Sequence, residues 1–445
     1  MRALPLALAL CATPGCVGFV GGVIPDTGRT DSREPRDTQP PVEELPAWVG
    51  SGADGALDLS ERLVLDVDTR SGREHPDAVR YTVQSISGAT VTTSESAQGF
   101  ETGDAAILIN QRGSPSAYAA VGAWAIVEVA SVDGATVELS GDPGVLFAEA
   151  GNQDLVDQVV VLQRVPQYTS VTLLAGASLT VSGWDRTGGG VLALRAREGL
   201  HVFAGAAIDL RGLGYAGGAT GSAGCDGYQG ESITGWGAGG ACGGGYNEGI
   251  GAYGPNLGGG GCNITGGGGG HGGYGLPGES WTSGYTAPSG GDAYGDAALQ
   301  ALHLGSGGGG VWNGSDGTEG PGGAGGGIAL LAASTITVDA GGSILASGAD
   351  THAWSSGNFT YGAGGGAGGS IWLISQGASL ADGSVLAQGG AGEASYERYG
   401  GDGGPGRVRV DCQLCNDAEY GSAAATEALA LASEPDPGWS EAPPE

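Results

Sequence analysis

The side chains that commonly perform catalysis are sparse and dispersed in this sequence. The five histidines show no H-x-x-x-H or H-E-x-x-H spacing, which would place two zinc ligands on one helix face. No G-x-S-x-G motif lies between a strand and a helix to expose a nucleophilic serine. Matches to G-x-G-x-x-G fall inside glycine tracts with no helix after them, so they follow from composition rather than from phosphate binding. These observations predict a protein that is not an enzyme.

Three aspartates support the alternative, an extracellular polysaccharide-active enzyme. Asp209, Asp339 and Asp382 occupy roughly comparable places in successive copies of a sequence repeat, so they could line one edge of the fold. Glycoside hydrolysis needs a pair of carboxyl groups, and repeat-built β folds do host polysaccharide-cleaving enzymes. The simpler interpretation is that these acids are solvent-facing turn residues.

No cofactor and no metal ligand is expected. Calcium is the alternative, because acidic residues lie near glycine turns and carboxylates are preferred calcium ligands. No D-x-D-x-D-G loop supports it. His271 lies in a glycine run, where its side chain could either bind a metal ion or simply pack against the backbone. Cys412 and Cys415 have the spacing of a zinc or redox motif, but no second pair or nearby histidine completes such a site.

Aromatic residues punctuate the glycine-rich stretch and supply the candidate binding residues. A stretch with so few apolar side chains cannot bury all of them in a conventional core. They can cement packed glycine segments, or their flat amphipathic rings can contact a sugar or a protein. On the second interpretation, the ligand-binding candidates are Trp236, Trp281, Tyr285 and Trp312. The partner would be a glycan or a protein at the cell surface.

Charge and composition restrict the partners further. The formal net charge is −31 at pH 7, and all 17 basic residues are arginine. Duplex nucleic acid needs a basic protein surface, so nucleic acid is not an expected partner. The lack of lysine excludes Schiff-base lysines and the P-loop lysine. The 95 glycines gather mostly between 212 and 406 and favour an architectural role before a catalytic one.

The N-terminal residues predict an exported and tethered chain. Residues 1–22 have the charged and apolar regions of a signal peptide. Thr13-Pro14-Gly15-Cys16 resembles a lipoprotein box, so Cys16 is a candidate lipidation site, and ordinary cleavage near Gly22 is the alternative. Residues 23–57 are acidic and proline-rich and predict a disordered linker. We therefore expect an extracellular or outer-envelope location in a bacterium, with membrane contact only through a lipid anchor.

Cysteines in the mature chain are candidates for disulfide bonds, because an exported protein folds in an oxidising compartment. Their spacing alone does not fix the connectivity. The candidates are Cys225, Cys242, Cys262, Cys412 and Cys415.

The elements that would position all these residues are strands. Residues 58–185 contain short β runs separated by turn signals, which predicts a β barrel or sandwich. Residues 186–212 form the first copy of a repeat with three short strands, and 327–412 contain copies two to four. Such recurrence predicts an all-β fold with a β-solenoid-like repeat region, and one hairpin-rich sheet is the competing arrangement. Residues 413–445 predict an acidic disordered tail.

Residues 213–326 form a glycine-rich insert between the first two copies. Such a stretch either stays disordered or offsets its ordering entropy through dense backbone hydrogen bonding. Extended helices with three residues per turn can pack laterally when no Cβ atoms separate them. A three-residue spacing occurs locally at Gly221, Gly224, Gly227 and Gly230. We expect an ordered, polyglycine II-like insert.

Several motifs resemble those of bacterial secreted glycine-rich β-repeat proteins, which are mostly uncharacterised. Members typically read VPQYTNVTV, GGILAFRA and GTIDVSGKGYRGG, and Leu213 stands here in place of the usual lysine. The matching stretches are VPQYTSVT at 165–172, GGVLALRA at 189–196, IDLRGLGYAGG at 208–218 and the closing GPGRVRVD at 404–411. The insert is also similar in composition to adhesin tips of phage long tail fibres and to the glycine-rich domain of anaplastic lymphoma kinase. Those proteins pack polyglycine helices to display binding loops.

The expected function is that of an exported, surface-tethered structural or adhesive protein that displays a glycine-rich, aromatic-studded region. The alternatives are the polysaccharide-active enzyme and a structural spacer without a ligand.

Overall fold

The fold is built from β-strands. The computed structural model of the chain describes residues 47–143, 155, 157–220, 227–235, 257–260, 265–279, 287–311, 320–351, 354–356, 359–392, 394–395, 398–415 and 425–430. Within these residues one short 3-10 turn, Ala47–Val49, accompanies the strands, and no α-helix is present. The predicted all-β class is therefore confirmed.

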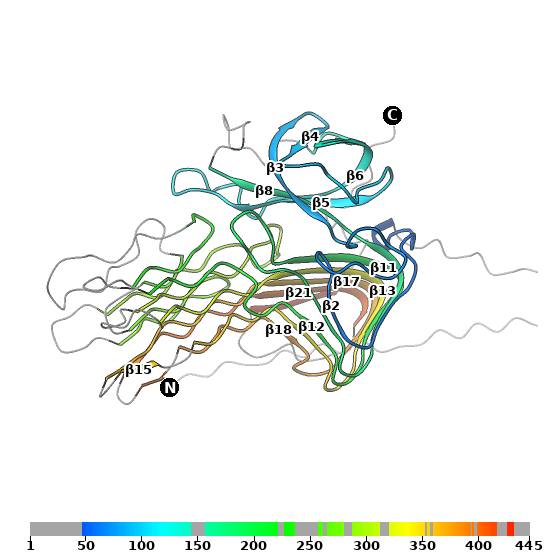
Figure 1. The fold of residues 1–445 in the computed structure, drawn as a ribbon. Helices are drawn as coiled ribbons and strands as arrows, with labels where there is room; N and C mark the ends of the chain where they lie inside the picture. The colour runs from blue at the N-terminus through cyan, green and yellow to red at the C-terminus, as the bar shows by residue number, and fades with distance from the viewer. Residues whose placement is uncertain are drawn as a thin grey trace, which may run out of the picture. The chain divides into compact units, whose positions relative to one another are not determined.

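Two parallel sheets form the centre of the fold (Figure 1). The long-strand sheet has the order β1 (Leu57–Leu59), β9 (Gln167–Leu173), β11 (Val191–Val202), β13 (Ile328–Val338), β17 (Ser370–Leu380), β21 (Arg407–Cys415) and β22 (Ala425–Ala430). The short-strand sheet has the order β18 (Val385–Leu386), β14 (Ser343–Leu345), β12 (Ala207–Asp209), β10 (Ser178–Thr180) and β2 (Arg62–Val64). From β9 to β14, and again from β17 to β18, consecutive strands of the chain lie alternately in the long-strand sheet and in the short-strand sheet. Each return to a sheet adds the next neighbouring strand to it.

The predicted repeat copies pair with one another, with one difference in their internal structure. Val191 pairs with Ile328, and Ile328 pairs with Ser370. We expected three strands in each copy. In the structure the first two are one long strand, interrupted in β11 only by a register shift between Ala196 and Gly199. A local irregularity of this kind bends a strand without ending it, and the sequence pattern does not distinguish the two cases.

Ladders of aliphatic side chains fill the space between the sheets. On the long-strand sheet, Leu194, Leu331 and Leu373 are paired neighbours and fully buried. On the short-strand sheet, Leu179 and Ile208 pair in the same way and belong to the same cluster. Each buried side chain of this size stabilises the fold by about 1.5–3 kcal/mol. Stacking identical ladder positions therefore builds one continuous core from copies that cannot fold alone.

Six antiparallel strands between β2 and β9 pair in a closed circuit. They are β3 (Arg80–Ser87), β4 (Thr90–Thr93), β7 (Thr136–Leu139), β6 (Trp124–Asp133), β5 (Ala105–Arg112) and β8 (Val159–Arg164), in pairing order. Trp124 packs edge-on against Trp372 of β17, with 5.7 Å between ring centroids. The outer face of the long-strand sheet is therefore buried as well.

The strand pairing divides the N-terminal β region at different residues from those expected. The sequence analysis placed 58–185 in one β domain. The closed circuit spans 80–164, whereas β1 and β2 pair with β9 and β10 in the two parallel sheets. Short apolar runs show that a strand forms, but periodicity does not show which partner it takes. The boundary therefore depends on long-range pairing that the sequence does not display.

Extended glycine segments leave the ends of the strands and hydrogen-bond to one another in three directions. Segment 305–311 shows the pattern. The N–H groups of residues 305, 308 and 311 donate to the carbonyls of residues 326, 323 and 320, respectively. Those of residues 307 and 310 donate to a second segment, at residues 231 and 228. The N–H of residue 309 donates to a third segment, at residue 267. The carbonyls of segment 305–311 accept from 215 and 218, from 259, and from 364 and 367. Successive residues thus hydrogen-bond to different neighbouring segments, and the direction of the bonds recurs every three residues, as in extended helices with three residues per turn.

The contact distances explain why these segments are glycine. A Cβ atom on Gly308 would lie 2.0 Å from the carbonyl oxygen of Gly364, and one on Gly309 would lie 2.0 Å from that of Gly260. The backbones approach so closely that no side chain fits at these positions, and we call the assembly of these segments the glycine array. The array extends beyond the predicted insert, because segments 346–349, 362–369, 387–390 and 400–406 belong to it.

Candidate functional site

The glycine array has two ends that the strand order distinguishes. Segments 305–311 and 320–326 are antiparallel neighbours, with Gly305 bonded to Gly326 and Val311 bonded to Gly320. Gly326 lies two residues before the start of β13 at Ile328, so the Gly305–Gly326 end adjoins the strands. We call the opposite end, at Val311 and Gly320, the distal end.

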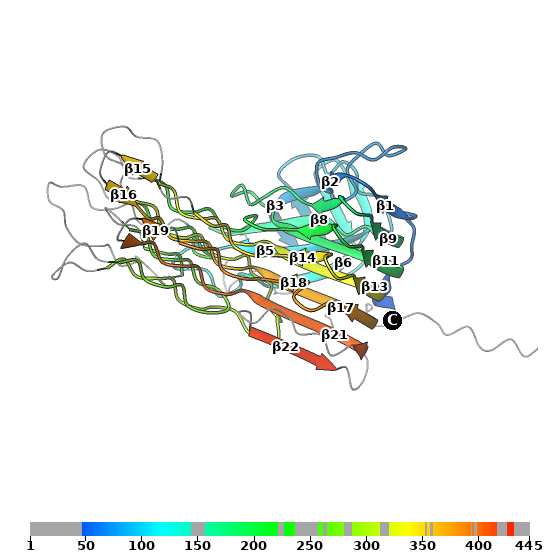
Figure 2. The same ribbon diagram turned by 90° about the horizontal axis from the view of Figure 1, so that it is seen from below.

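Other excursions of the chain turn at the same distal end (Figure 2). Between the repeat strands lie two hairpins, formed by β15 (Trp354–Ser356) with β16 (Phe359–Tyr361) and by β19 (Ala394–Ser395) with β20 (Arg398–Tyr399). The N–H of Glu279 donates to the carbonyl of Tyr399 at 3.0 Å, and Thr265 bridges to Gly362. Several separate excursions of the chain therefore meet at this one end of the array.

The four predicted ligand-binding residues, Trp236, Trp281, Tyr285 and Trp312, lie outside the described residues. The described residues on either side of them nevertheless separate into two groups. Interval 312–319 starts and ends at the distal end, and so does interval 280–286, because Glu279 bonds to Tyr399 and Gly278 to Pro288. Interval 236–256 starts and ends at the strand end, because Ile233 accepts from Gly113 and Leu257 accepts from Gly270. The described residues that flank the interval containing Trp236 thus lie at a different end from those that flank the other two intervals.

The described aromatics of the insert also separate into two groups. Tyr274 is 71% exposed on the outside of the array. Tyr294 instead donates to the carbonyl of Leu304 at 2.6 Å and accepts from Ser306 at 3.0 Å. Tyr215 is fully buried where the array meets β5. Tyr294 and Tyr215 therefore pack inside the fold and Tyr274 lies on its surface, while contact with a sugar or protein stays a prediction.

A polar cluster is buried where the array meets the strands. The rings of His271 and His303 lie 6.1 Å apart between centroids, and Tyr294 packs against both. His271 Nδ1 lies 2.7 Å from the carbonyl oxygen of Gly368, which makes Nδ1 the protonated nitrogen. Arg407 donates to the carbonyl of Tyr294 at 3.0 Å. The cluster is structural, because it connects the chain turns that precede β17 and β21.

Among the described residues, no group of three or more His, Cys, Asp or Glu side chains is placed to hold a metal ion. Burial and the neighbouring His303 lower the pKa of His271 to about 3. Burial lowers the pKa of His303 to about 4. Both imidazoles are therefore neutral at physiological pH.

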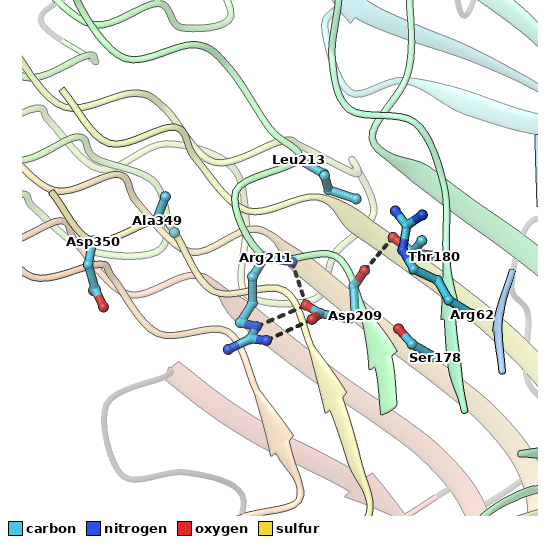
Figure 3. A pocket seen from close by; sticks show the side chains of 9 residues that line it. Arg62, Ser178, Thr180, Asp209, Arg211, Leu213, Ala349 and Asp350 are labelled. Atoms are coloured by element: carbon cyan, nitrogen blue, oxygen red, sulfur yellow. Dashed lines mark hydrogen bonds and ion pairs between the residues drawn. The ribbon is translucent and has the colours of Figure 1, made fainter. Parts of the chain in front are cut away.

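A polar hollow of about 340 Å³ opens on the outer face of the short-strand sheet, next to the array (Figure 3). Asp209 lies at its centre and forms a bidentate ion pair with Arg211, with O···N distances of 2.9 and 2.7 Å. Burial would raise the pKa of Asp209, but hydrogen bonds and charge from Arg211 outweigh it and lower the pKa. A carboxylate held in this way is a poor general acid.

The three aspartates of the enzyme hypothesis do not form one row. Asp209 pairs across the sheet with Leu345, and Leu345 pairs with Leu386. Asp339 follows β13 in the other sheet and lies 3.1 Å from His201. The expectation that Asp209 occupies a place comparable to those of Asp339 and Asp382 is therefore wrong. Asp339 and Asp382 follow the paired residues Val338 and Leu380, whereas Asp209 ends β12 in the other sheet, and an aspartate near a glycine looks alike in sequence in both settings.

Cys412 and Cys415 lie within disulfide distance, with Cα atoms 5.7 Å apart. The other candidate cysteines, Cys16, Cys225, Cys242 and Cys262, lie outside the described residues. Among the described residues no helix is long and apolar enough to cross a membrane.

No protein-family model and no curated protein matches this chain.

Proposed function

We propose that this chain is an exported, surface-tethered structural or adhesive protein without enzymatic activity. It displays loops for a glycan or protein partner from the distal end of the glycine array. The observation that carries the proposal is that the excursions of the chain turn at one common end of an array bonded in three directions. A rigid lattice of this kind holds loop ends in fixed positions, which reduces the entropy lost when they bind a partner.

The finer architecture follows the same proposal. The two parallel sheets are coils of a β-solenoid, the closed circuit is a barrel domain inserted into its first coil, and the array is a polyglycine II bundle. In support, the chain alternates between sheets with one strand gained in each. The six-stranded circuit is complete, and the three-residue period of the hydrogen bonds fits polyglycine II.

Attachment at the cell surface is the second part of the proposal. Signal-peptide cleavage would leave the chain extracellular or in the outer envelope, with lipidation at Cys16 as the anchor. The acidic linker after Cys16 would hold the folded region away from the membrane.

Glycan-array binding by the purified chain tests the display proposal. We expect Trp281→Ala and Trp312→Ala to lower the bound signal at least about tenfold, because stacked aromatic anchors dominate such contacts. Trp236→Ala is the matched control, since its interval starts and ends at the strand end, and its signal should equal that of the parent chain. Equal losses in all three variants, or binding to no glycan or surface protein, would refute display from the distal end.

A further inference from the structure

The polar hollow beside Asp209 contains an arginine, Arg62, whose positive charge helps to lower the pKa of Asp209 but whose guanidinium N–H groups bond to no described residue. Its lining comes from three strands of the short-strand sheet and from the array: Arg62, Ser178, Thr180, Asp209, Arg211, Leu213, Gly348, Ala349 and Asp350. Among the described residues, Arg62 makes no hydrogen bond or ion pair with another side chain or carbonyl group. Most other described arginines form such contacts; Arg211, for example, is held by Asp209.

The sheet register places Arg62 beside a floor of small residues. Arg62 pairs with Ser178, and Ser178 pairs with Ala207. Paired residues on neighbouring strands lie about 4.8 Å apart, and in a sheet their side chains project to the same face. The Arg62 side chain extends past this serine, and its guanidinium ends beside Thr180, whose hydroxyl donates to the carbonyl of Asp209 at 2.6 Å (Figure 3). The small serine and alanine side chains leave room for a ligand group beside Arg62.

The opposite side of the hollow offers hydrogen-bond acceptors. Arg62 and Asp350 lie on opposite sides of the Asp209–Arg211 pair (Figure 3). Asp350 accepts the N–H of Ala391 through Oδ1 at 2.7 Å, which leaves Oδ2 for a ligand hydroxyl. Leu213 and Ala349 add apolar surface between these polar groups. A ligand that matches this lining carries one negative charge, several hydroxyl groups and an apolar face.

We infer that the hollow binds a uronic-acid residue of an oligosaccharide, with its carboxylate on Arg62 and its hydroxyl groups on Ser178 and Asp350. An arginine recognises a carboxylate through two parallel N–H···O bonds, and only a group without an existing partner has both donors free. A free phosphate has no ring hydroxyl groups for Ser178 and Asp350 and no apolar face for Leu213. A hollow of about 340 Å³ lies at the lower end of the range for small-molecule sites, which suits a short saccharide.

Calorimetric titration of the full chain with trigalacturonic acid tests this inference. We expect saturable binding that weakens at least about tenfold in Arg62→Gln, because a charge-assisted bidentate contact is lost. Arg197→Gln is the matched control: Arg197 is also an exposed strand arginine, on β11, but it does not line the hollow. Its affinity should equal that of the parent chain, and Ser178→Ala should weaken binding severalfold.

The uncharged trisaccharide of galactose separates recognition of the carboxylate from general sugar binding. We expect it to bind at least about tenfold more weakly than trigalacturonic acid. The inference is overturned by any of three results: no saturable binding of trigalacturonic acid, equal affinity for the uncharged trisaccharide, or equal losses in Arg62→Gln and Arg197→Gln. Thermal unfolding of each variant confirms that the fold is retained. These variants leave the distal end unchanged, so the result is independent of the display proposal.

Discussion

Replacement of Gly308 by alanine is expected to disrupt the glycine array and to lower the free energy of unfolding by at least about 3 kcal/mol. The added Cβ would lie 2.0 Å from the carbonyl oxygen of Gly364, whereas real contacts of this kind are essentially never shorter than 3.0 Å. Gly308 also donates to Gly323 and accepts from Gly218. No displacement relieves the clash without lengthening hydrogen bonds to other segments.

Gly377→Ala is the matched control for this prediction. Gly377 lies in β17, its φ is not in the left-handed region, and its nearest neighbour to an added Cβ is Thr335 Cγ2 at 3.8 Å. Alanine at such a position restricts the unfolded chain and should be neutral or stabilising by less than about 1 kcal/mol. Chemical denaturation followed by circular dichroism measures both variants. Equal unfolding midpoints for Gly308→Ala and Gly377→Ala would contradict close packing of the array.

Acid is expected to destabilise the junction between the array and the strands. The pKa values of His271 and His303, about 3 and about 4, are both below the value near 6.5 of an unfolded histidine. At pH values between the folded and the unfolded pKa of each histidine, the unfolded chain therefore binds more protons than the folded chain. Stability from the two neutral rings is complete above about pH 6.5 and is lost as the pH falls toward 4 and then 3. At about 1.4 kcal/mol per pKa unit, each histidine contributes roughly 3–5 kcal/mol.

The slope of stability against pH measures this effect separately from side-chain packing. His303→Gln should lower stability at neutral pH, because a packed ring is replaced. It should also flatten the decline between pH 6.5 and pH 4, because one titrating group is removed. Denaturant unfolding of the parent chain and the variant at several pH values gives both slopes. Parallel curves for the two proteins would show that His303 is not a buried neutral imidazole.

The sequence could predict those parts of the fold that depend on the pattern of apolar and polar side chains. Alternating and continuous apolar runs predicted strands, and recurrence of the runs that begin at Val191 and Ile328 predicted that these copies pair. The partners of β1 and β2 were not predictable, because three-residue strands carry no pattern that selects a partner. The bonding partners within the array were equally hidden, since glycines are identical and only backbone geometry assigns their neighbours.

For the candidate sites, too, the sequence indicated some of the residues but not the long-range contacts that determine their chemistry. Asp209 was noticed in the sequence, but its ion pair with Arg211, two residues away, changes its chemistry from a possible acid to a neutralised group. Arg62 was missed, because a lone exposed arginine is ordinary until the register places it beside Ser178 and the hollow. The burial of His303 beside His271 depends on contacts across the array. No spacing rule for histidines indicates such contacts.

The glycine array is central to this account, and amide hydrogen exchange read by mass spectrometry tests it most directly. Segment 305–311 donates N–H groups in three directions to carbonyls at 2.8–2.9 Å. We predict that its amide hydrogens exchange at least about a hundredfold more slowly than in an unstructured glycine peptide, because exchange requires the array to open. The same protection is expected in 364–369. Exchange of both segments at the rate of an unstructured peptide would contradict the array and, with it, display from its distal end.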